Sequence, residues 1–393
     1  MQQFRAVLAP GPAGPGRVIG QWLTRPETQA VFAALSGHRV LAVGGCVRNA
    51  LMFRPVADVD MATDALPDQV TELAQAAGLR VVPTGIDHGT VTVVSGGISH
   101  EVTTFRRDIE TDGRHAVVAF TDDVALDAAR RDFTMNALYC AADGTVIDPL
   151  GGLPDLRARR VRFVGDPAAR IAEDHLRILR FFRFHAWNAG DGIDADGLAA
   201  CAAAAERIDR LSRERIGAEM RKLLSAVDPA PAVAAMAQAG ILARILPGAD
   251  PRALAPLVHL DRDHDPDWLR RLAALGGEDA EARLRLSRAE ARDLDALRAA
   301  IGDGTSPAVL GHRLGTARAE DAMLLRAAVL DVPLPLDWAK EVARGANAVF
   351  PVTAANLMPA LHGPALGARL TTLTDRWLAS DLRLTRDDLL SGA

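Results

Sequence analysis

The pattern of apolar and polar positions divides this chain into two parts near residue 155. In the first part, short apolar or alternating runs are bounded by Gly-rich turns, which is typical of strands. We expect strands at 39–43, 58–62, 80–83, 90–94 and 100–105. Helical periodicity over 20–36 and 67–77, and a short helix that ends near Phe53, complete a mixed α/β head.

After Asp155 the strand pattern almost disappears, and helical periodicity continues to the last residues. Its clearest helices are expected at 168–187, 196–205, 212–226 and 229–240. Pro and Gly interrupt the pattern between later helices. We therefore expect an α+β protein in which an α/β head precedes a long all-helical remainder.

Composition adds one local feature to this picture. About half of the 393 residues are apolar, and the formal net charge of −5 does not by itself indicate a nucleic-acid-binding protein. Lysine occurs only at Lys222 and Lys340, so arginine supplies nearly all the positive charge. Between Asp155 and His185, eight arginines stand against four carboxylates, which makes this stretch locally basic.

Cysteine usage and hydropathy favour the cytoplasm. Cys46, Cys140 and Cys201 are far apart and form no CxxC pair, so neither a zinc site nor a disulfide framework is expected. The sequence has no pattern of a signal peptide and no apolar run long enough to span a membrane. We expect no membrane association and no obligate protein partner.

Two short motifs in the head suggest phosphate and metal chemistry. Gly44 and Gly45 leave a strand and open a helix, where a phosphate can approach the backbone and Arg48 adds a charged donor. A tight turn needs glycine in any case. Asp58 and Asp60 share one face of a strand, and paired carboxylates suit Mg²⁺, although a solvated strand end is the simpler explanation.

Three further features are weaker alone. Glu101 on a neighbouring strand would join the two aspartates, or it would face solvent. The run from Arg130 to Ala137, RRDFTMNA, has a charged start and a buried continuation. In the run from Glu173 to Arg183, three arginines recur every three residues and Glu173 precedes Arg177 by four, which is either a binding face or a solvated basic face.

The order and spacing of these motifs resemble the family of tRNA nucleotidyltransferases and bacterial poly(A) polymerases. The chain is similar to the series GGxVRD, DxD, RRDxTxNA and EDxxRxxR, followed by Arg-Ile-Gly-Ala-Glu at 215–219. The resemblance covers roughly residues 39–225. Two positions depart from it: Asn49 replaces the usual Asp, and Phe53 stands where Gly is common.

The resemblance implies a role for each matching residue. It implies Asp58 and Asp60 as Mg²⁺ ligands, with Glu101 as a third catalytic carboxylate. It implies nucleotide binding by Gly44, Gly45, Arg48, Arg131, Asp132, Asp174, Arg177, Arg180 and Arg183. Asp174 and Arg177 would select C and A by their exocyclic amino group and ring acceptor, whereas a simple helix cap at Asp174 is the alternative.

The resemblance also implies an architecture and an activity. The fold would be a polymerase-β-like head with a mixed five-stranded sheet at 1–150, a helical neck at 151–226, and a tRNA-binding helical body and tail at 227–393. The activity would be addition of C, C and A to the tRNA 3′ end from CTP and ATP, by two-metal phosphoryl transfer with release of pyrophosphate.

Four other readings of the sequence remain open. A poly(A) polymerase shares all the motifs, as does an enzyme that adds only A. An inactive RNA-binding protein would not need Asp58 and Asp60, and a small-molecule nucleotidyltransferase would not need the helical remainder. In that remainder, Asp261, Asp263 and Asp265 have the first spacings of a calcium loop, but Pro266 replaces the glycine that such a loop requires.

Overall fold

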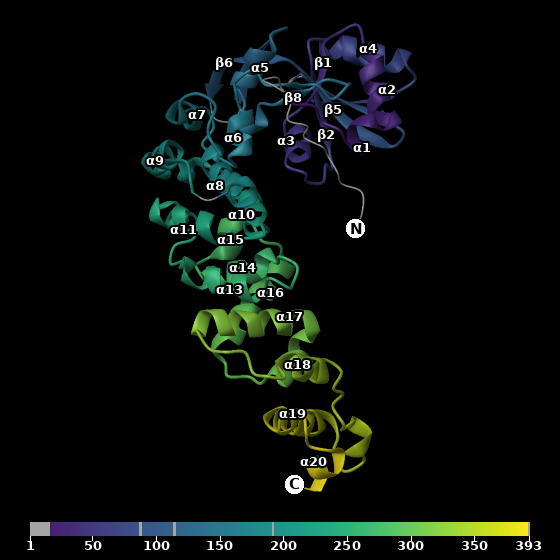
Figure 1. The fold of residues 1–393 in the computed structure, drawn as a ribbon. Coiled ribbons are helices and arrows are strands. Elements are labelled where there is room, and N and C mark those ends of the chain that lie inside the picture. Colours follow the sequence, from purple (N-terminus) through teal and green to yellow (C-terminus); the bar gives the residue numbers. More distant parts are fainter. Residues whose placement is uncertain (1–15, 86–88, 113–114, 191, 392–393) are drawn as a thin grey trace. The chain divides into compact units, whose positions relative to one another are not determined.

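The computed structural model describes residues 16–85, 89–112, 115–190 and 192–391. The chain forms two compact units, Met1–Leu211 and Ser212–Ala393. The first contains the strands and the second is built from helices (Figure 1). The α+β class expected from the sequence is confirmed.

A mixed sheet organises the first unit. Its strands are β1 (Val40–Val43), β2 (Val59–Thr63), β3 (Arg80–Gly85), β4 (Thr90–Ser95), β5 (Ile98–Thr104), β8 (Tyr139–Cys140) and β9 (Val146–Ile147). They lie in the order β3-β4-β5-β2-β1-β8-β9, and only β2 and β5 pair in parallel. The expected five-stranded sheet is thus extended to seven strands, because β8 and β9 are too short to show an alternating pattern.

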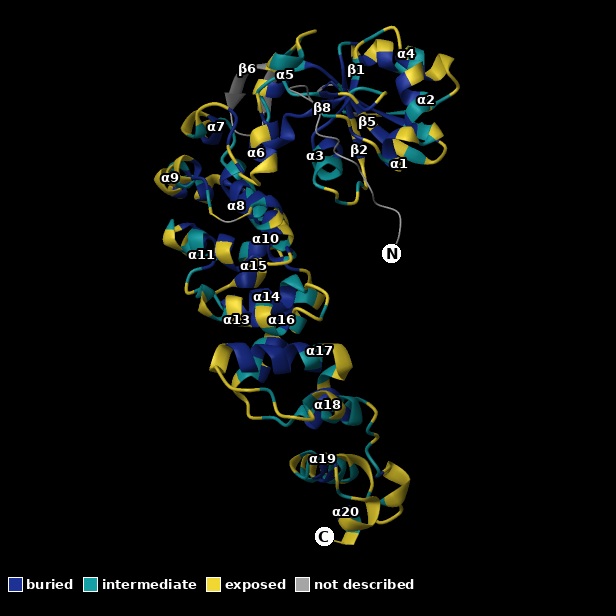
Figure 2. Ribbon diagram, viewed as in Figure 1, coloured by how far each residue is buried: buried dark blue, intermediate teal, exposed yellow. Residues whose placement is uncertain are grey.

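Burial alternates along β5 and at the start of β2, whereas β1 and β4 are mostly buried (Figure 2). Val59 and Met61 of β2 are buried while Asp60 between them is exposed. This alternation places the acidic side chain on the opposite face from the core, as a period of two requires. A separate two-stranded sheet, β6 (Arg106–Asp112) with β7 (His115–Phe120), has no counterpart in the strands expected from the sequence.

The helices near the sheet begin at a proline (α2 and α4), at a side-chain cap (α5) or after a glycine (α1 and α3). The helices near the sheet are α1 (Gln21–Thr24), α2 (Pro26–Ala34), α3 (Gly45–Leu51), α4 (Pro67–Ala76) and α5 (Val124–Ala129). α2 and α4 contact the sheet at β4 and β5. The helix expected over 20–36 is split in two, since Arg25 before Pro26 has the extended backbone that a following proline favours.

Four helices follow the sheet in the first unit: α6 (Leu153–Arg157), α7 (Pro167–Glu173), α8 (Leu176–Asn188) and α9 (Ala195–Ala203). The single helix expected over 168–187 is therefore wrong. Asp174 has extended backbone angles, and its Oδ1 accepts a hydrogen bond from the Leu176 amide at 3.0 Å. This local side-chain bond ends one helix and begins the next.

The second unit is a succession of helices. They are α10 (Arg213–Leu224), α11 (Ala230–Gln238), α12 (Ile241–Ile245), α13 (Leu254–Leu260), α14 (Trp268–Leu275), α15 (Ala280–Leu284), α16 (Arg288–Gly302), α17 (Pro307–Leu330), α18 (Trp338–Ala346), α19 (Gly363–Ala379) and α20 (Arg386–Ser391). Glycine permits the close approach of α17 and α18, because a Cβ at Gly345 would lie 1.7 Å from the Ala308 carbonyl oxygen. No described helix is long and apolar enough to cross a membrane.

Candidate active site

Three carboxylates lie on the parallel pair β2 and β5. Asp60 is directly opposite Glu101 in the register, and Asp58 immediately precedes β2. All three are exposed. Desolvation raises the pKa of Asp60, the negative charges of Glu101 and Asp58 raise it further, and Arg131 opposes them. The sequence-predicted carboxylates are thus brought together as a mutually repelling set.

Two carboxylates are a sufficient protein contribution to a magnesium site. Among the described residues, no group of three or more His, Cys, Asp or Glu side chains is placed to hold a metal. Mg²⁺ commonly takes one or two carboxylates and completes its shell with water and substrate phosphates. The hard oxygens of Asp58 and Asp60, and the unfavourable ionisation of Asp60, fit a divalent cation of this kind.

The turn between β1 and α3 brings Arg131 to the glycine pair. Gly44 has a φ of 73°, and a Cβ there would lie 3.4 Å from Nη1 of Arg131 and 3.7 Å from the Asn136 carbonyl oxygen. Both the left-handed backbone and this close approach favour glycine. Gly45 is the first residue of α3. Residues separated by almost ninety positions in the sequence therefore meet at this turn.

Two amides hold Arg48 on α3. Its Nη1 donates to Oδ1 of Asn136, and its Nε and Nη2 donate to Oδ1 of Asn49 at 3.2 and 2.9 Å. Burial lowers the pKa of Arg48 to about 10, with Asp132 opposing and Arg183 adding to the effect. Asn49, which departs from the family pattern, thus positions Arg48 and brings no negative charge.

A tyrosine and a carboxylate hold Arg131. Nε of Arg131 donates to the Tyr139 hydroxyl at 3.1 Å, and its Nη2 donates to Oδ2 of Asp127 at 3.0 Å. Tyr139 in turn donates to the same Asp127 oxygen at 2.7 Å. Burial alone would lower the pKa of Arg131, but the Tyr139 and Asp127 contacts raise it. The guanidinium is fixed beside the glycine turn and remains charged.

Asp132 connects the head to α8. Its Oδ2 accepts from Nε of Arg180 at 2.8 Å, and its Oδ1 accepts from Nδ2 of Asn136 at 2.9 Å. Although burial opposes ionisation, Arg180 and Asn136 hold the pKa of Asp132 below its ordinary value. Both carboxylate oxygens therefore have protein partners, and Asn136 joins Asp132 to Arg48.

The junction of α7 and α8 fixes Arg177. Its Nη1 forms an ion pair with Glu173 and donates to the Arg170 carbonyl oxygen at 2.8 Å. The expected pairing of Glu173 with Arg177 is confirmed, although it spans the break between the two helices. Asp174 lies at this break and caps α8, as the alternative expectation proposed; its role in base selection stays a prediction.

Several residues of the site were not identified from the sequence. Asp127, Asn136, Tyr139, Arg170 and Phe184 hold predicted residues in place, or support the backbone beside them. Arg170 is only 7% exposed and donates to the carbonyl oxygens of Arg130 and Arg131, so it is a structural member of the basic stretch. The single tyrosine of the chain was the one available signal, since a lone buried phenol needs a polar partner.

Phe53 now has a physical explanation. It follows α3 with a φ of 57°, in the left-handed region where glycine is favoured, and its side chain is 51% exposed. The glycine common at this position in the family fits that backbone.

The free cysteine Cys46 of the same motif is buried, and burial raises its pKa to about 12, so it is no nucleophile.

Two features of the second unit are structural. Asp261, from the calcium-like spacing, is buried and pairs with Arg270 at 2.8 Å and Arg271 at 3.3 Å.

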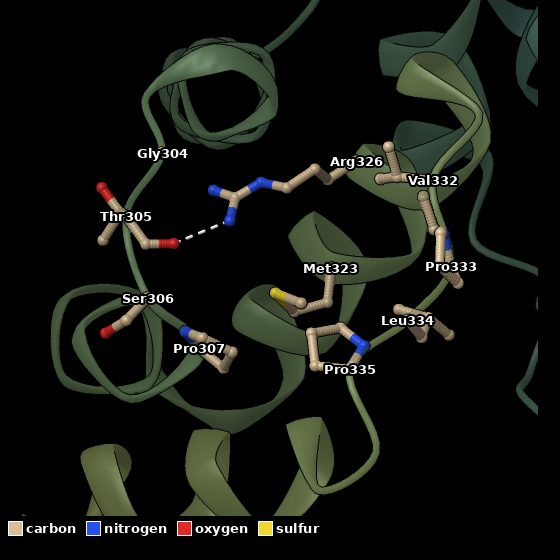
Figure 3. Close-up of a pocket in the computed structure, with 11 residues that line it drawn as sticks. Gly304, Thr305, Ser306, Pro307, Met323, Arg326, Val332, Pro333, Leu334 and Pro335 are labelled. Carbon is tan, nitrogen blue, oxygen red and sulfur yellow. Dashed lines mark hydrogen bonds between the residues drawn. The ribbon is translucent and has the colours of Figure 1, made fainter.

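A pocket of about 210 Å³ is lined by residues 304–307, Met323, Arg326, Ala327 and 332–335 (Figure 3). Arg326 donates to the carbonyl oxygens of Ala300 and Thr305, both at 2.7 Å, and also pairs with Asp303. It supports the loop around the pocket.

Comparison with protein families gives two matches. Residues 40–162 match the poly A polymerase head domain, and residues 192–252 match a probable RNA- and SrmB-binding site of polymerase A. The first covers the sheet, the glycine turn and the paired carboxylates. The second begins after α8 and extends into the second unit.

Curated relatives are named for CCA addition. The chain is 42% identical over 217 residues to the mitochondrial CCA tRNA nucleotidyltransferase 1 of Mus musculus, covering 52% of this chain and 50% of that protein. It is 39% identical over 240 residues to the CCA-adding enzyme of Geobacillus thermodenitrificans, covering 61% and 55%. The chain spans about half the length of the curated relatives it matches.

Solved structures extend the similarity. The CCA-adding enzyme of Bacillus stearothermophilus in complex with CTP matches with a TM-score of 0.70 and 28% identity, covering 91% of this chain and 94% of that one. The Thermotoga maritima CCA-adding enzyme complexed with tRNA matches with a TM-score of 0.68, and its 18% identity supports the fold alone.

Proposed function

We propose, from the premise that this chain belongs to the family of CCA-adding tRNA nucleotidyltransferases and poly(A) polymerases, that it adds C, C and A to the 3′ end of tRNA. CTP and ATP are the proposed substrates, and pyrophosphate is the leaving group. One observation carries the proposal. Asp60 and Glu101 are register partners on the adjacent strands β2 and β5, and the charge of Glu101 acts on Asp60. Arg131, which also acts on Asp60, lies beside the glycine turn.

Nucleotidyltransferases generally use a divalent metal ion, and Mg²⁺ is the proposed ion for this protein. Asp58 and Asp60 would hold it, with Glu101 contributing negative charge beside Asp60. When bound, the metal supplies a polarised 3′-hydroxyl and charge stabilisation on the leaving pyrophosphate. The repulsion that raises the pKa of Asp60 supports this assignment, because a cation would relieve it.

The positive residues would bind and orient the triphosphate. Arg48 lies beside Gly45 and is held by amides, and Arg131 lies beside Gly44 and is held by Asp127 and Tyr139. Charged donors that are already ordered lose little entropy when a polyanion binds. Such fixed charges stabilise a transition state in which negative charge moves toward the leaving group.

Base selection is proposed for Asp174 and Arg177. A carboxylate accepts from the exocyclic amino group of C or A, and a guanidinium donates to the adjacent ring nitrogen. U and G present the opposite pattern, so both contacts would be lost. Glu173, Arg170 and Arg130 hold Arg177 through an ion pair and two carbonyl groups, which supports a reading role. Arg180 and Arg183 follow on the same helix.

tRNA is proposed to bind through arginines of the neck at 151–226 and through the helical body and tail at 227–393. Arg207, Arg210, Arg213, Arg215 and Lys222 belong to the proposed contact set. Arg221 is a basic residue of the same stretch, but it pairs with Glu290 at 3.0 Å and lies over the ring of Trp268. Affinity should fall steeply between about 50 and about 300 mM salt, since each neutralised phosphate releases counterions.

A cytoplasmic location completes the proposal, supported by three free cysteines. The alternative function is poly(A) synthesis, or addition of A alone. The matched head domain is described as that of poly A polymerase, which favours keeping this alternative.

The deciding experiment uses tRNA transcripts that lack all or part of the CCA end, with each labelled nucleotide added alone and then together. CCA addition predicts C incorporation on the shortest transcript and a single A only after two C. Long A tails from ATP alone would support poly(A) synthesis. A product only on transcripts that already end in CC would support the A-adding alternative.

A further inference from the structure

Three arginines converge on one aromatic ring in the first unit. The guanidinium carbons of Arg48, Arg180 and Arg183 lie 5.1, 5.4 and 4.5 Å from the centroid of the Phe184 ring. Arg48 comes from α3, whereas the other two come from α8 itself. Phe184 is 7% exposed, so the ring is enclosed by these and other side chains. An aromatic face attracts a cation by its quadrupole at such distances.

The ring differs from a carboxylate in what it does to charge. A carboxylate would hold an arginine but cancel its positive charge, whereas a phenyl ring holds it and adds none. Arg48 has this kind of support throughout, because its hydrogen bonds go to the amides of Asn49 and Asn136. Burial is the main cause that lowers the pKa of Arg48, and the positive charge of Arg183 lowers it further.

We propose that Phe184 is a positioning residue for the nucleotide triphosphate, because its ring gathers Arg48, Arg180 and Arg183 into one preassembled cationic group. This inference rests on the proposed function and deepens it. A triphosphate is the polyanion whose charge such a group would match. Amides also hold Arg48, and Asp132 pairs with Arg180, so the ring is the contact that these two arginines share with Arg183. Without this shared contact the group would be less ordered, and a bound nucleotide would have to order it.

The structure provides a matched control for removing this ring. Phe184 and Phe163 each lie 5.0 Å from the ring of Phe133, with interplanar angles of 52° and 51°. Both are buried. Phe184→Leu and Phe163→Leu therefore remove a similar ring from the same aromatic cluster. Phe163→Leu leaves the three arginine contacts intact, so the pair separates positioning from packing.

The experiment measures equilibrium binding of CTP and ATP with Mg²⁺ and without RNA, and displacement of each nucleotide by inorganic tripolyphosphate. We expect Phe184→Leu to weaken CTP, ATP and tripolyphosphate alike by about 10- to 30-fold, the sum of three weakened cation–π contacts. Phe163→Leu should stay within about 2-fold of the wild type. Phe184→Tyr keeps the ring and should retain affinity. In turnover, the KM for nucleotide should rise more than kcat falls.

Equal losses in the two leucine variants would overturn the inference, because packing alone would then explain them. Loss of nucleotide affinity without loss of tripolyphosphate affinity would also overturn it, since the ring would then act on the base. If Phe184→Leu fails to fold, Phe184→Met, which keeps volume without a ring, replaces it in the comparison. A wild-type protein that binds neither nucleotide contradicts the proposed function itself.

Discussion

Arginine serves two different purposes in the two units of this protein. In the first unit, Arg48 and Arg131 are half-buried, and Arg131 acts on Asp60, whose carboxylate is repelled by those of Glu101 and Asp58. In the second unit, Arg270 and Arg271 are 3% and 1% exposed, and their terminal nitrogens donate to carboxylates and carbonyl oxygens. The same residue type is thus proposed to bind a ligand in the first unit, whereas in the second unit its partners are buried groups of the fold.

In the second unit, the buried arginines are held by carboxylates and by carbonyl oxygens of the backbone. Arg271 donates to the carbonyl oxygens of Leu224, Ala226 and Val227, which lie at and beyond the end of α10. It therefore satisfies acceptors that helix geometry leaves without a partner. Asp261 pairs with both Arg270 and Arg271, and Asp321 supplies the second negative charge by pairing with Arg270. Buried charges of this kind are tolerated because each is paired with an opposite charge and hydrogen-bonded.

The largest effect is expected from Asp60→Asn, which should reduce nucleotide addition by about 10³-fold or more while the protein stays folded. The amide keeps the shape of the side chain but removes the negative charge that the proposed metal needs. Asp68→Asn, an exposed acidic residue of α4, is the control and should retain activity. Initial rates at saturating Mg²⁺ and the circular dichroism spectrum test this, and near-normal rates would contradict the assignment.

Arg271→Met should lower the stability of the protein, whereas Asp60→Asn should lower its activity. Removing one partner of a buried ion pair typically costs about 3–5 kcal/mol of unfolding free energy. The carbonyl groups at the end of α10 would also lose their donor. Arg252→Met removes an arginine that is 89% exposed and should cause no measurable change. Urea unfolding compares the two variants, and similar midpoints would show that the buried network is no more important than a surface pair.

Asp174→Ala tests whether Asp174 reads the base or only caps α8. If Asp174 reads the base, loss of its acceptor should reduce the preference for CTP and ATP over UTP and GTP by about 10²-fold. The cap on α8 would weaken at the same time. Asp166→Ala removes the corresponding cap of α7 and controls for that loss. Unchanged selectivity with lower stability would leave Asp174 a structural residue.

The smallest effect concerns pH. The pKa of Asp60 is raised in the folded state, so the folded protein holds this proton more tightly than the unfolded chain does. The ionised residue therefore destabilises the fold at neutral pH, and this cost disappears as the pH falls through the raised pKa. Without divalent ions, Asp60→Asn should be the more stable protein at about pH 7 and lose that advantage toward about pH 4.5.

Urea midpoints of wild type and Asp60→Asn across this range provide the measurement. The lowered pKa of Asp132 acts in the opposite direction in both proteins and cancels in the difference. Added Mg²⁺ should remove the advantage of Asp60→Asn at neutral pH, because the cation stabilises the wild-type carboxylates. An advantage that grows on acidification would contradict the charge repulsion.

The sequence predicts the local elements of the head well. Alternation in β2 places Val59 and Met61 in the core and Asp60 outside, and the structure confirms this. It does not predict the break at Asp174, because the apolar positions of α7 and α8 continue in phase across it. The two-residue strands β8 and β9 are invisible for a related reason, since alternation needs several residues to be recognised.

Candidate ligands were found from the sequence, and their supports were not. Asp58, Asp60 and Arg48 belong to short motifs whose residue types already indicate the chemistry. Phe184 looks like an ordinary core residue, and Asn136 was visible only as a member of the RRDxTxNA motif, without any sign that it would accept from Arg48. Asn49 was visible only as a departure from the family pattern, and its role as an acceptor for Arg48 came from the structure.

The sequence by itself determined the residue types that can bind a metal and a triphosphate, and which of them share a strand or a helix. These properties depend on side-chain chemistry and on periods of two and 3.6 residues. Only the tertiary structure decided that Asp60 lies opposite Glu101 in the strand register and that Arg131 reaches Gly44. It also decided which arginines are buried among partners of the fold. Those outcomes depend on strand order and packing between distant segments, because a guanidinium group takes its role from the partners that surround it.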